Sequence, residues 1–249
     1  MKRSVPRVAV ILLSVALPLA ACGAGGGTSE PVGTVATSAS ESTATSEQTS
    51  SSAGLESRFL AEVWADNWFS LWVNGTQVGE DSVPITTERS FNADVIRFTA
   101  DYPLTIAMVT KDYIEDESGL EYIGEPKQQI GDGGFIAQIT DLETGRVVLT
   151  TSKEWRGMVI QTAPLNPECA SSTDPAAECR HDRLDEPGNW QSESFDPAGW
   201  MAATEYTEEE VGTKDGYDDI DWDPGARLIW GSNLELQNWI LWRAPRVSS

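Results

Sequence analysis

The sequence is poor in the residues from which hydrolytic sites and metal centres are most often built. Its 249 residues include three cysteines and one histidine, His181. This histidine lies two residues after Cys179, and no GxSxG motif supplies a serine nucleophile, which argues against a Ser-His-Asp hydrolase. The phosphate-binding patterns GxGxxG and GxxxxGK followed by Ser or Thr do not occur either. We therefore assign no catalytic residue from the sequence.

The N-terminal 21 residues form a short apolar segment behind a basic start. Lys2, Arg3 and Arg7 precede an apolar run from Val8 to Ala21, which is typical of an export signal and short for a membrane span. Leu19-Ala20-Ala21-Cys22 resembles the lipobox of bacterial lipoproteins. The resemblance implies that cleavage leaves Cys22 as a diacylated N-terminus and that this lipid holds the exported protein on the extracytoplasmic face of a bacterial membrane. An ordinary export signal with an incidental cysteine is the alternative.

Positive charge is scarce throughout the chain. There are 17 Lys and Arg residues against 39 Asp and Glu residues, for a net charge of −22. Cleavage of the export segment removes three basic residues, which leaves 14 against 39 and a net charge of −25. Such a charge repels nucleic acid and anionic membrane surfaces, so we expect no nucleic-acid partner and contact with the membrane through the lipid on Cys22.

The rest of the chain divides into a tether and one domain. Residues 22–56 are rich in Ser, Thr, Gly and Ala and contain no aromatic residue, so they cannot bury enough apolar area to fold and are predicted to be a flexible tether. Residues 57–249 contain all ten tryptophans and are predicted to form a single domain.

Two cysteines remain within that domain. Cys169 and Cys179 are separated by nine residues, which is not a zinc-ligand spacing. In an exported protein an even pair this close predicts a disulfide that closes an irregular loop.

The apolar pattern predicts an all-β domain. Short β-branched or aromatic runs alternate with Gly, Asp, Asn and Pro, which favours an antiparallel β-sandwich. The segment from Asp141 to Gly145 is predicted to connect two of these strands as a hairpin. The predicted strands cover residues 94–99, 104–110, 134–140, 146–151, 155–162, 227–231 and 239–243.

The stretch from Ala65 to Gly79 is ambiguous in its periodicity. Trp64, Trp68 and Trp72 are four residues apart, a spacing that puts them on one face of either a helix or a strand. The aromatic and β-branched run at 68–73, followed by Asn-Gly, favours a strand and a hairpin. In that strand the core face consists of Phe69, Leu71 and Val73.

Three segments of the domain resemble galactose-binding-like β-sandwich modules. They are ADNWFSLWVNGTQVGED at 65–81, GNWQSESFDPAGWMAATEY at 188–206 and RLIWGSNLELQNWILWR at 227–243. A related resemblance is to protective-antigen-type sugar-binding sandwiches, which place acidic residues before a strand of the LWVNG type. Both resemblances imply a sandwich, of jelly-roll type in the galactose-binding-like modules, that binds glycans through loops at one end, and neither implies catalysis.

The resemblance places ligand or calcium contacts at Asp66 and Asn67. Asp112 and Asp132 are candidate additional oxygen donors, and Trp68 is a candidate platform for a sugar ring. Calcium is the candidate structural ion, although it needs six to eight oxygens. The alternatives are that Asp66 and Asn67 cap a turn and that the tryptophans, Trp72 above all, serve packing.

The acidic segment 214–225 is predicted to be a solvated loop. Asp219, Asp221 and Asp223 alternate as in an EF-hand, but Pro224 stands where that loop needs glycine and Trp230 where it needs glutamate.

The function expected from the sequence is that of a membrane-tethered extracytoplasmic lipoprotein whose β-sandwich binds carbohydrate or a related extracellular ligand. One alternative is a glycoside hydrolase with two catalytic carboxylates, although no pair stands out among so many acidic residues. Another is a protein-binding adhesion or envelope-organising lipoprotein, which an exposed apolar patch would favour.

Overall fold

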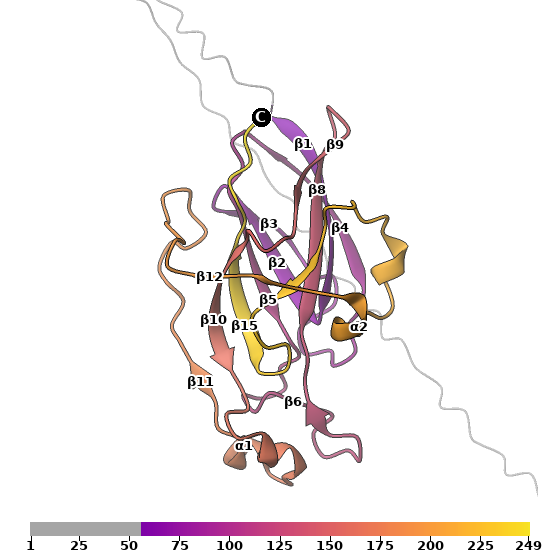
Figure 1. The fold of residues 1–249 in the computed structure, drawn as a ribbon, viewed down its shortest axis with the longest axis vertical. Helices are drawn as coiled ribbons and strands as arrows, with labels where there is room; N and C mark the ends of the chain where they lie inside the picture. Colours follow the sequence, from indigo (N-terminus) through magenta and orange to yellow (C-terminus); the bar gives the residue numbers. More distant parts are fainter. Residues whose placement is uncertain (1–55) are drawn as a thin grey trace, which may run out of the picture. The chain divides into compact units, whose positions relative to one another are not determined.

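Two antiparallel sheets pack face to face in the computed structural model, which describes residues 56–249 (Figure 1). The first sheet has the strand order β13-β14-β8-β1-β4, and β9 also pairs with β8. The second has the order β11-β10-β15-β5-β2-β3, and β12 also pairs with β10. The predicted antiparallel β-sandwich is confirmed. The predicted signal peptide, Cys22 and residues 22–55 of the predicted tether lie outside the described residues.

The predicted strands all occur, each with its bounds within two residues of those expected. The strands are β1 (Ser57–Asp66), β2 (Trp68–Val73), β3 (Thr76–Glu80), β4 (Ala93–Ala100), β5 (Ile106–Lys111), β6 (Leu120–Glu121), β7 (Gln129–Ile130), β8 (Gly134–Asp141), β9 (Arg146–Thr150), β10 (Arg156–Thr162), β11 (Asp182–Arg183), β12 (Met201–Ala202), β13 (Thr204–Tyr206), β14 (Leu228–Trp230) and β15 (Gln237–Arg243). The helical turns are η1 (Pro167–Ser171), α1 (Pro175–Glu178), α2 (Glu208–Val211) and η2 (Tyr217–Asp219). Within the described part of the chain, the helices are too short to cross a membrane.

The interior between the sheets is built by strict alternation of side chains. Phe69, Leu71 and Val73 of β2 are at most 3 % exposed and lie in the main apolar core, which confirms the predicted core face. Trp242 of β15 is fully buried in the same core. Side chains at even-numbered spacing on a strand share a face, so the intervening residues of β2 point away from this core.

The strand prediction for the tryptophan stretch is confirmed, but its three tryptophans do not share a face. Trp64 belongs to β1 in the first sheet, whereas Trp68 and Trp72 belong to β2 in the second. The chain passes from one sheet to the other at Asp66 and Asn67. A spacing of four residues predicts a shared face only within one strand. It does not apply to Trp64 and Trp68, because their strands lie in different sheets and each sheet has its own buried face.

Both predicted hairpins form. Asn74 and Gly75, with φ of 51° and 81°, make the tight turn between β2 and β3. This left-handed pair is the backbone of a type I′ turn, which Asn-Gly favours. Gly145, with φ of 70°, ends the β8–β9 connection.

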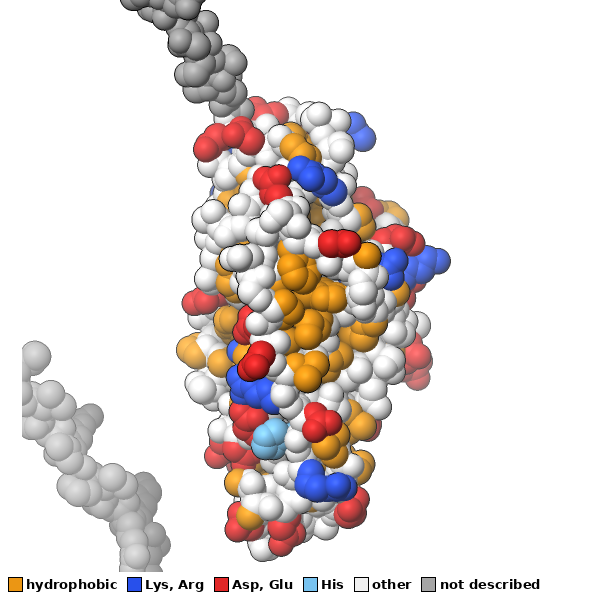
Figure 2. Space-filling model, turned by 90° about the vertical axis from the view of Figure 1, so that its left-hand side faces the viewer, with side chains coloured by type: hydrophobic (Ala, Val, Ile, Leu, Met, Phe, Trp, Pro, Cys, Tyr) orange, Lys and Arg blue, Asp and Glu red, His pale blue; other side chains and the backbone are white. Residues whose placement is uncertain are grey.

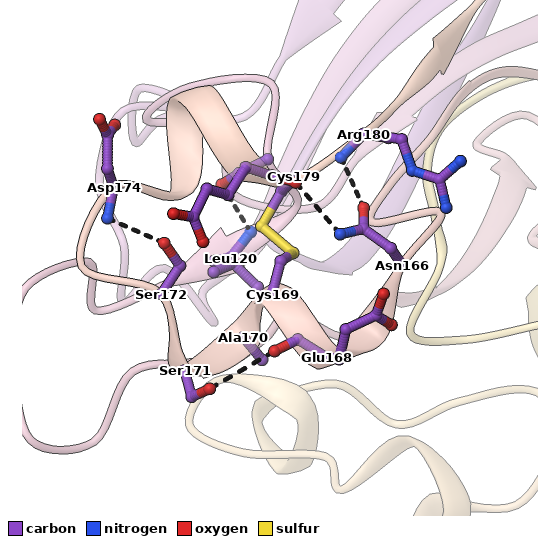
Figure 3. Close-up of a disulfide and its surroundings, with 12 residues drawn as sticks. Leu120, Asn166, Glu168, Cys169, Ala170, Ser171, Ser172, Asp174, Cys179 and Arg180 are labelled. Atoms are coloured by element: carbon purple, nitrogen blue, oxygen red, sulfur yellow. Dashed lines mark hydrogen bonds between the residues drawn. A yellow bond between two sulfur atoms is a disulfide. The ribbon is translucent and has the colours of Figure 1, made fainter.

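The predicted disulfide is also present (Figure 3). The sulfur atoms of Cys169 and Cys179 are 1.99 Å apart. Both cysteines are buried against Leu120, and the Asn166 side chain braces the loop by accepting a hydrogen bond from Arg180 N at 2.7 Å. The disulfide therefore closes the η1–α1 loop, and its cysteines pack this loop against the short β6–β7 sheet.

We expect the double substitution Cys169→Ala and Cys179→Ala to lower the free energy of unfolding by about 2–3 kcal/mol, because a short covalent loop is opened in the unfolded chain. Urea denaturation of the full chain measures the change. As a chemical control, reduction of the denatured wild-type protein should release two thiols. Equal thiol counts before and after reduction would contradict the bridge.

Candidate functional site

Three of the predicted site residues meet where β1 and β5 end and β2 begins. Asn67 N donates a hydrogen bond to Lys111 O at 3.0 Å, which brings Asp112 beside the Asp66–Asn67 connection. The exposed fractions of Asp66, Asn67 and Asp112 are 1 %, 0 % and 1 %. The structure therefore brings these residues together, but beneath the surface, where a saccharide does not reach them.

The oxygen atoms of this group are largely committed to the protein. Tyr113 N donates to Asn67 Oδ1 and to Asp112 Oδ1, each at 2.6 Å. Asp66 Oδ2 lies 3.5 Å from the ammonium of Lys214. Asp66 Oδ1 has no hydrogen-bond partner. These contacts hold the two strand ends together and fit the turn-forming alternative for Asp66 and Asn67.

The group belongs to a larger set of carboxylates, which we call the buried acidic cluster: Asp66, Asp112, Glu121 and Asp132. Burial raises the pKa of Asp112 well above its usual range, and the negative charges of Glu121, Asp66 and Asp132 raise it further. Burial also raises the pKa of Asp66 well above its usual range, helped by Asp132 and opposed by Lys214. The pKa of Glu121 is raised as well, chiefly by burial. The raised pKa values of Asp66, Asp112 and Glu121 therefore favour the protonated forms of these three carboxyl groups.

The buried acidic cluster does not fit a calcium ion. Among residues 56–249, no three His, Cys, Asp or Glu side chains are arranged to hold a metal ion. Calcium takes six to eight oxygens, whereas Tyr113 N already donates to oxygens of Asn67 and Asp112, and the Lys214 ammonium lies beside Asp66. We assign no cation to this place.

Sequence reasoning missed Glu121 and Lys214 as neighbours of the predicted site. Glu121 lies in the two-residue strand β6, and Lys214 lies in the predicted acidic loop. No local pattern marks either residue. They reach Asp66 and Asp112 through tertiary packing of segments about ten to 150 positions away in the chain.

The outer face of the second sheet carries a different feature, a set of aromatic side chains. Alternation along β2 turns Trp68 and Trp72 outward, and both are half-buried. The segment at 184–200 adds further aromatic rings. We call the half-buried side chains of this surface the tryptophan platform; they are Trp68, Trp72, Met158, Phe195 and Trp200. Figure 2 shows apolar side chains gathered in the middle of one face of the molecule.

Buried Trp190 connects the parts of the platform. Its ring centroid lies 5.8 Å from that of Trp72 and 6.1 Å from that of Trp200. Its indole N–H donates to Glu186 Oε2 at 3.1 Å. Arg243 Nη1 donates to the carbonyl oxygens of Trp190 and Ser192, the latter at 2.9 Å. The 184–200 segment is thus held against the sheet by polar contacts as well as by ring packing.

Cationic side chains border one end of the platform. The Lys111 ammonium lies 5.5 Å from the ring centroid of Trp68 and 3.8 Å from that of Trp239. The Arg183 guanidinium lies 4.5 Å from the Trp239 ring centroid. Burial lowers the pKa of Lys111. The site therefore combines aromatic surface with hydrogen-bond donors, the two features that sugar recognition uses.

Four of the five predicted ligand residues therefore lie together, and Trp68 alone belongs to the tryptophan platform. Trp68 lies on the platform, Asp66, Asn67 and Asp112 are buried, and Asp132 is half-buried beside them in charge contact. Comparison of the chain with protein-family models, with curated proteins and with solved structures found no significant match. The resemblances to galactose-binding-like modules and to the lipobox stay predictions.

Proposed function

We propose that this protein is a lipid-anchored extracytoplasmic carbohydrate-binding protein whose ligand lies on the tryptophan platform. The observation that carries the proposal is the placement of Trp68, Trp72 and Trp200 on one outward face. Sugar rings present apolar C–H faces that pack on aromatic rings, while their hydroxyl groups need donors and acceptors nearby. Lys111 and Arg183 supply donors at the platform edge.

Two sequence features support the same proposal. The jelly-roll, galactose-binding-like resemblance is to modules that bind glycans, and the lipobox-like sequence at Cys22 fits a protein held at the outside of a bacterial membrane. The proposed contact surface differs from the loop site that the resemblance implied. Trp68 is the residue common to both, and it extends the ligand surface from the strand end onto the sheet.

Substitution of the platform tryptophans tests the proposal. The full chain is first screened against a broad glycan array with calcium and with chelator. For a glycan that binds, we expect Trp72→Ala and Trp68→Ala each to lower affinity by about tenfold, because each removes a stacking surface worth roughly 1 kcal/mol or more. Isothermal titration calorimetry gives the affinities.

The matched control for these variants is Trp222→Ala. Trp222 is also half-buried, but it packs on Tyr217 away from the platform. Its replacement should leave glycan affinity unchanged. Absence of binding to every glycan in both array conditions would refute the proposed function.

Protein binding through the same platform is the second candidate, favoured by the apolar patch in Figure 2. Cell-envelope preparations separate the two candidates. Retention on protease-treated envelopes, lost after periodate oxidation, supports a glycan. The opposite pattern supports a protein partner.

The glycoside hydrolase alternative receives no support from a specific carboxylate pair at the platform. The described carboxylates Asp66, Asp112 and Glu121, whose pKa values are raised, lie beneath the surface.

A further inference from the structure

One row of directly opposed residues runs from the platform across four strands. Trp72 of β2 faces Ala107 of β5, Ala107 faces Arg243 of β15, and Arg243 faces Arg156 of β10. Side chains directly opposite one another in a sheet point to the same side. The two arginines therefore continue the outward face that carries the tryptophans.

The arginines line a surface cavity of about 510 Å³. Phe195, which belongs to the platform, lines the same cavity and so joins the two features. Four other charged side chains line this cavity: Arg246, Glu193, Asp196 and Glu154.

Arg243 is buried without a counterion. It is 5 % exposed, its Nη1 donates to two carbonyl oxygens, and its Nε has no hydrogen-bond partner. Among residues 56–249 it forms no ion pair, although 39 residues of the chain are acidic. Burial lowers the pKa of this guanidinium, with no carboxylate acting against that effect. A buried charge is costly unless an opposite charge compensates it.

The acidic side chains around the cavity are exposed, and two of them have other partners. Glu193 pairs with Arg246 at 3.1 Å. Asp196 Oδ1 accepts a hydrogen bond from Ala198 N at 2.9 Å. Glu154 is exposed at the rim. Arg156, half-buried, forms no ion pair or side-chain hydrogen bond within residues 56–249. The cavity thus presents two uncompensated guanidinium groups beside an aromatic surface.

We propose that Arg156 and Arg243 bind the anionic substituent of a saccharide whose rings lie on the tryptophan platform. This inference rests on the proposed function and narrows its ligand to acidic saccharides, which carry a carboxylate or a sulfate. The guanidinium group matches the planar geometry of such oxyanions and binds them through paired N–H donors. The contacts of Arg243 with Trp190 and Ser192 secure the 184–200 segment, but they leave its positive charge without a counterion and do not involve the half-buried Arg156.

The test compares saccharides of one length and linkage that differ in charge. The full chain is titrated calorimetrically with neutral, uronic-acid and sulfated oligosaccharides. We expect at least one acidic form to bind about tenfold more tightly than the neutral form, a difference of about 1.4 kcal/mol, because a hydrogen bond between charged groups is stronger than one between neutral groups. The better of the two acidic forms identifies the substituent.

Arg156→Gln is the decisive variant, because the Arg156 side chain forms no ion pair or hydrogen bond within residues 56–249 that would hold the fold. It should bring the affinity for the acidic form close to that for the neutral form and leave neutral binding unchanged. Arg97→Gln is the matched control: Arg97 is exposed on β4 of the other sheet, and its replacement changes net charge equally.

A second measurement does not depend on variants. In nitrogen–proton NMR spectra of the full chain, addition of glucuronate should shift the Nε–H resonance of the half-buried Arg156, whereas glucose should not. Equal affinity for neutral and acidic saccharides, or an acidic preference that Arg156→Gln leaves intact, would overturn the anion site while the proposed function stands. Failure of every saccharide to bind would overturn both.

Discussion

Replacing Asp112 with asparagine should stabilise the protein at pH 7 to 8 and leave its stability near pH 4 almost unchanged. Asparagine keeps the Oδ1 atom that accepts the hydrogen bond of Tyr113 N. It removes a carboxyl group whose ionised form is disfavoured by burial and by three neighbouring carboxylates. The gain at neutral pH should be on the order of 1–3 kcal/mol, the usual desolvation cost of a buried polar group without compensation.

The pH dependence follows from the direction of the pKa shift. At pH values below the ordinary aspartate pKa of 3.8, Asp112 is protonated in both states. As the pH rises, the unfolded chain loses this proton first, so the free energy of unfolding falls until the pH passes the raised pKa of the folded state. Asp81, whose pKa burial raises to about 7, adds a similar fall between about pH 4 and 7. Asp112 and Asp81 should therefore make the wild-type protein more stable at pH 4 to 5 than at pH 8.

Urea denaturation at pH 4.5 and pH 8 measures the difference. Asp101→Asn provides the control, because Asp101 is exposed and its side chain forms no hydrogen bond to another described residue. That variant should shift stability little at either pH. A loss of stability in Asp112→Asn at pH 8 would contradict the raised pKa of Asp112.

Trp242→Ala should destabilise the domain by about 3–5 kcal/mol, the range for removal of a buried tryptophan. Trp242 is fully buried between the sheets, with its ring centroid 5.5 Å from that of Phe135. Its indole N–H donates to Thr110 Oγ1 at 2.9 Å. Gly157 faces the ring so closely that a Cβ atom there would lie 2.6 Å from it, and this shows that the pocket is shaped for the indole. The surrounding side chains therefore cannot collapse into the space without moving both sheets.

Thermal and urea denaturation of the full chain measure this loss. For a domain of this size each kilocalorie per mole corresponds to about 2–4 °C in Tm. Trp222→Ala, which removes a half-buried indole from the acidic segment, should cost roughly 1 kcal/mol. Equal losses for the two variants would show that Trp242 is not a central contact between the sheets.

The sequence predicts the elements whose causes are local. Asn74-Gly75 and Gly145 fix two hairpins through their left-handed backbone angles, and the alternation of Phe69 and Leu71 defines a buried face. The passage between sheets at Asp66 is not local in this sense. Its position depends on the pairing of β1 with β8, whose partners are 68 to 82 residues apart, and of β2 with β5, whose partners are 33 to 43 residues apart.

The candidate sites depend even more on distant segments. Trp68 and Trp72 are visible as an aromatic pair in the sequence, but Trp190 and Trp200 join them through a segment that crosses the outer sheet face. Arg243 and Arg156 are 87 residues apart and become neighbours through the register of β10 and β15. Side-chain chemistry could be read from the residues in advance, whereas register and loop placement could not.

The alternation of side chains along β15 separates the face that borders the proposed binding surface from the face that fills the interior. Trp239, Leu241 and Arg243 face outward, while Ile240 and Trp242 fill the interior. A substitution at an outward-facing position of β15 can therefore alter the proposed binding surface. The neighbouring inward-facing residues, on which stability depends, stay the same. Insertion of one residue into β15 before Trp242 would turn Arg243 inward and Trp242 toward solvent. Diversification of this protein, by selection or by a designed library, should thus proceed through exchange of outward side chains at constant strand length.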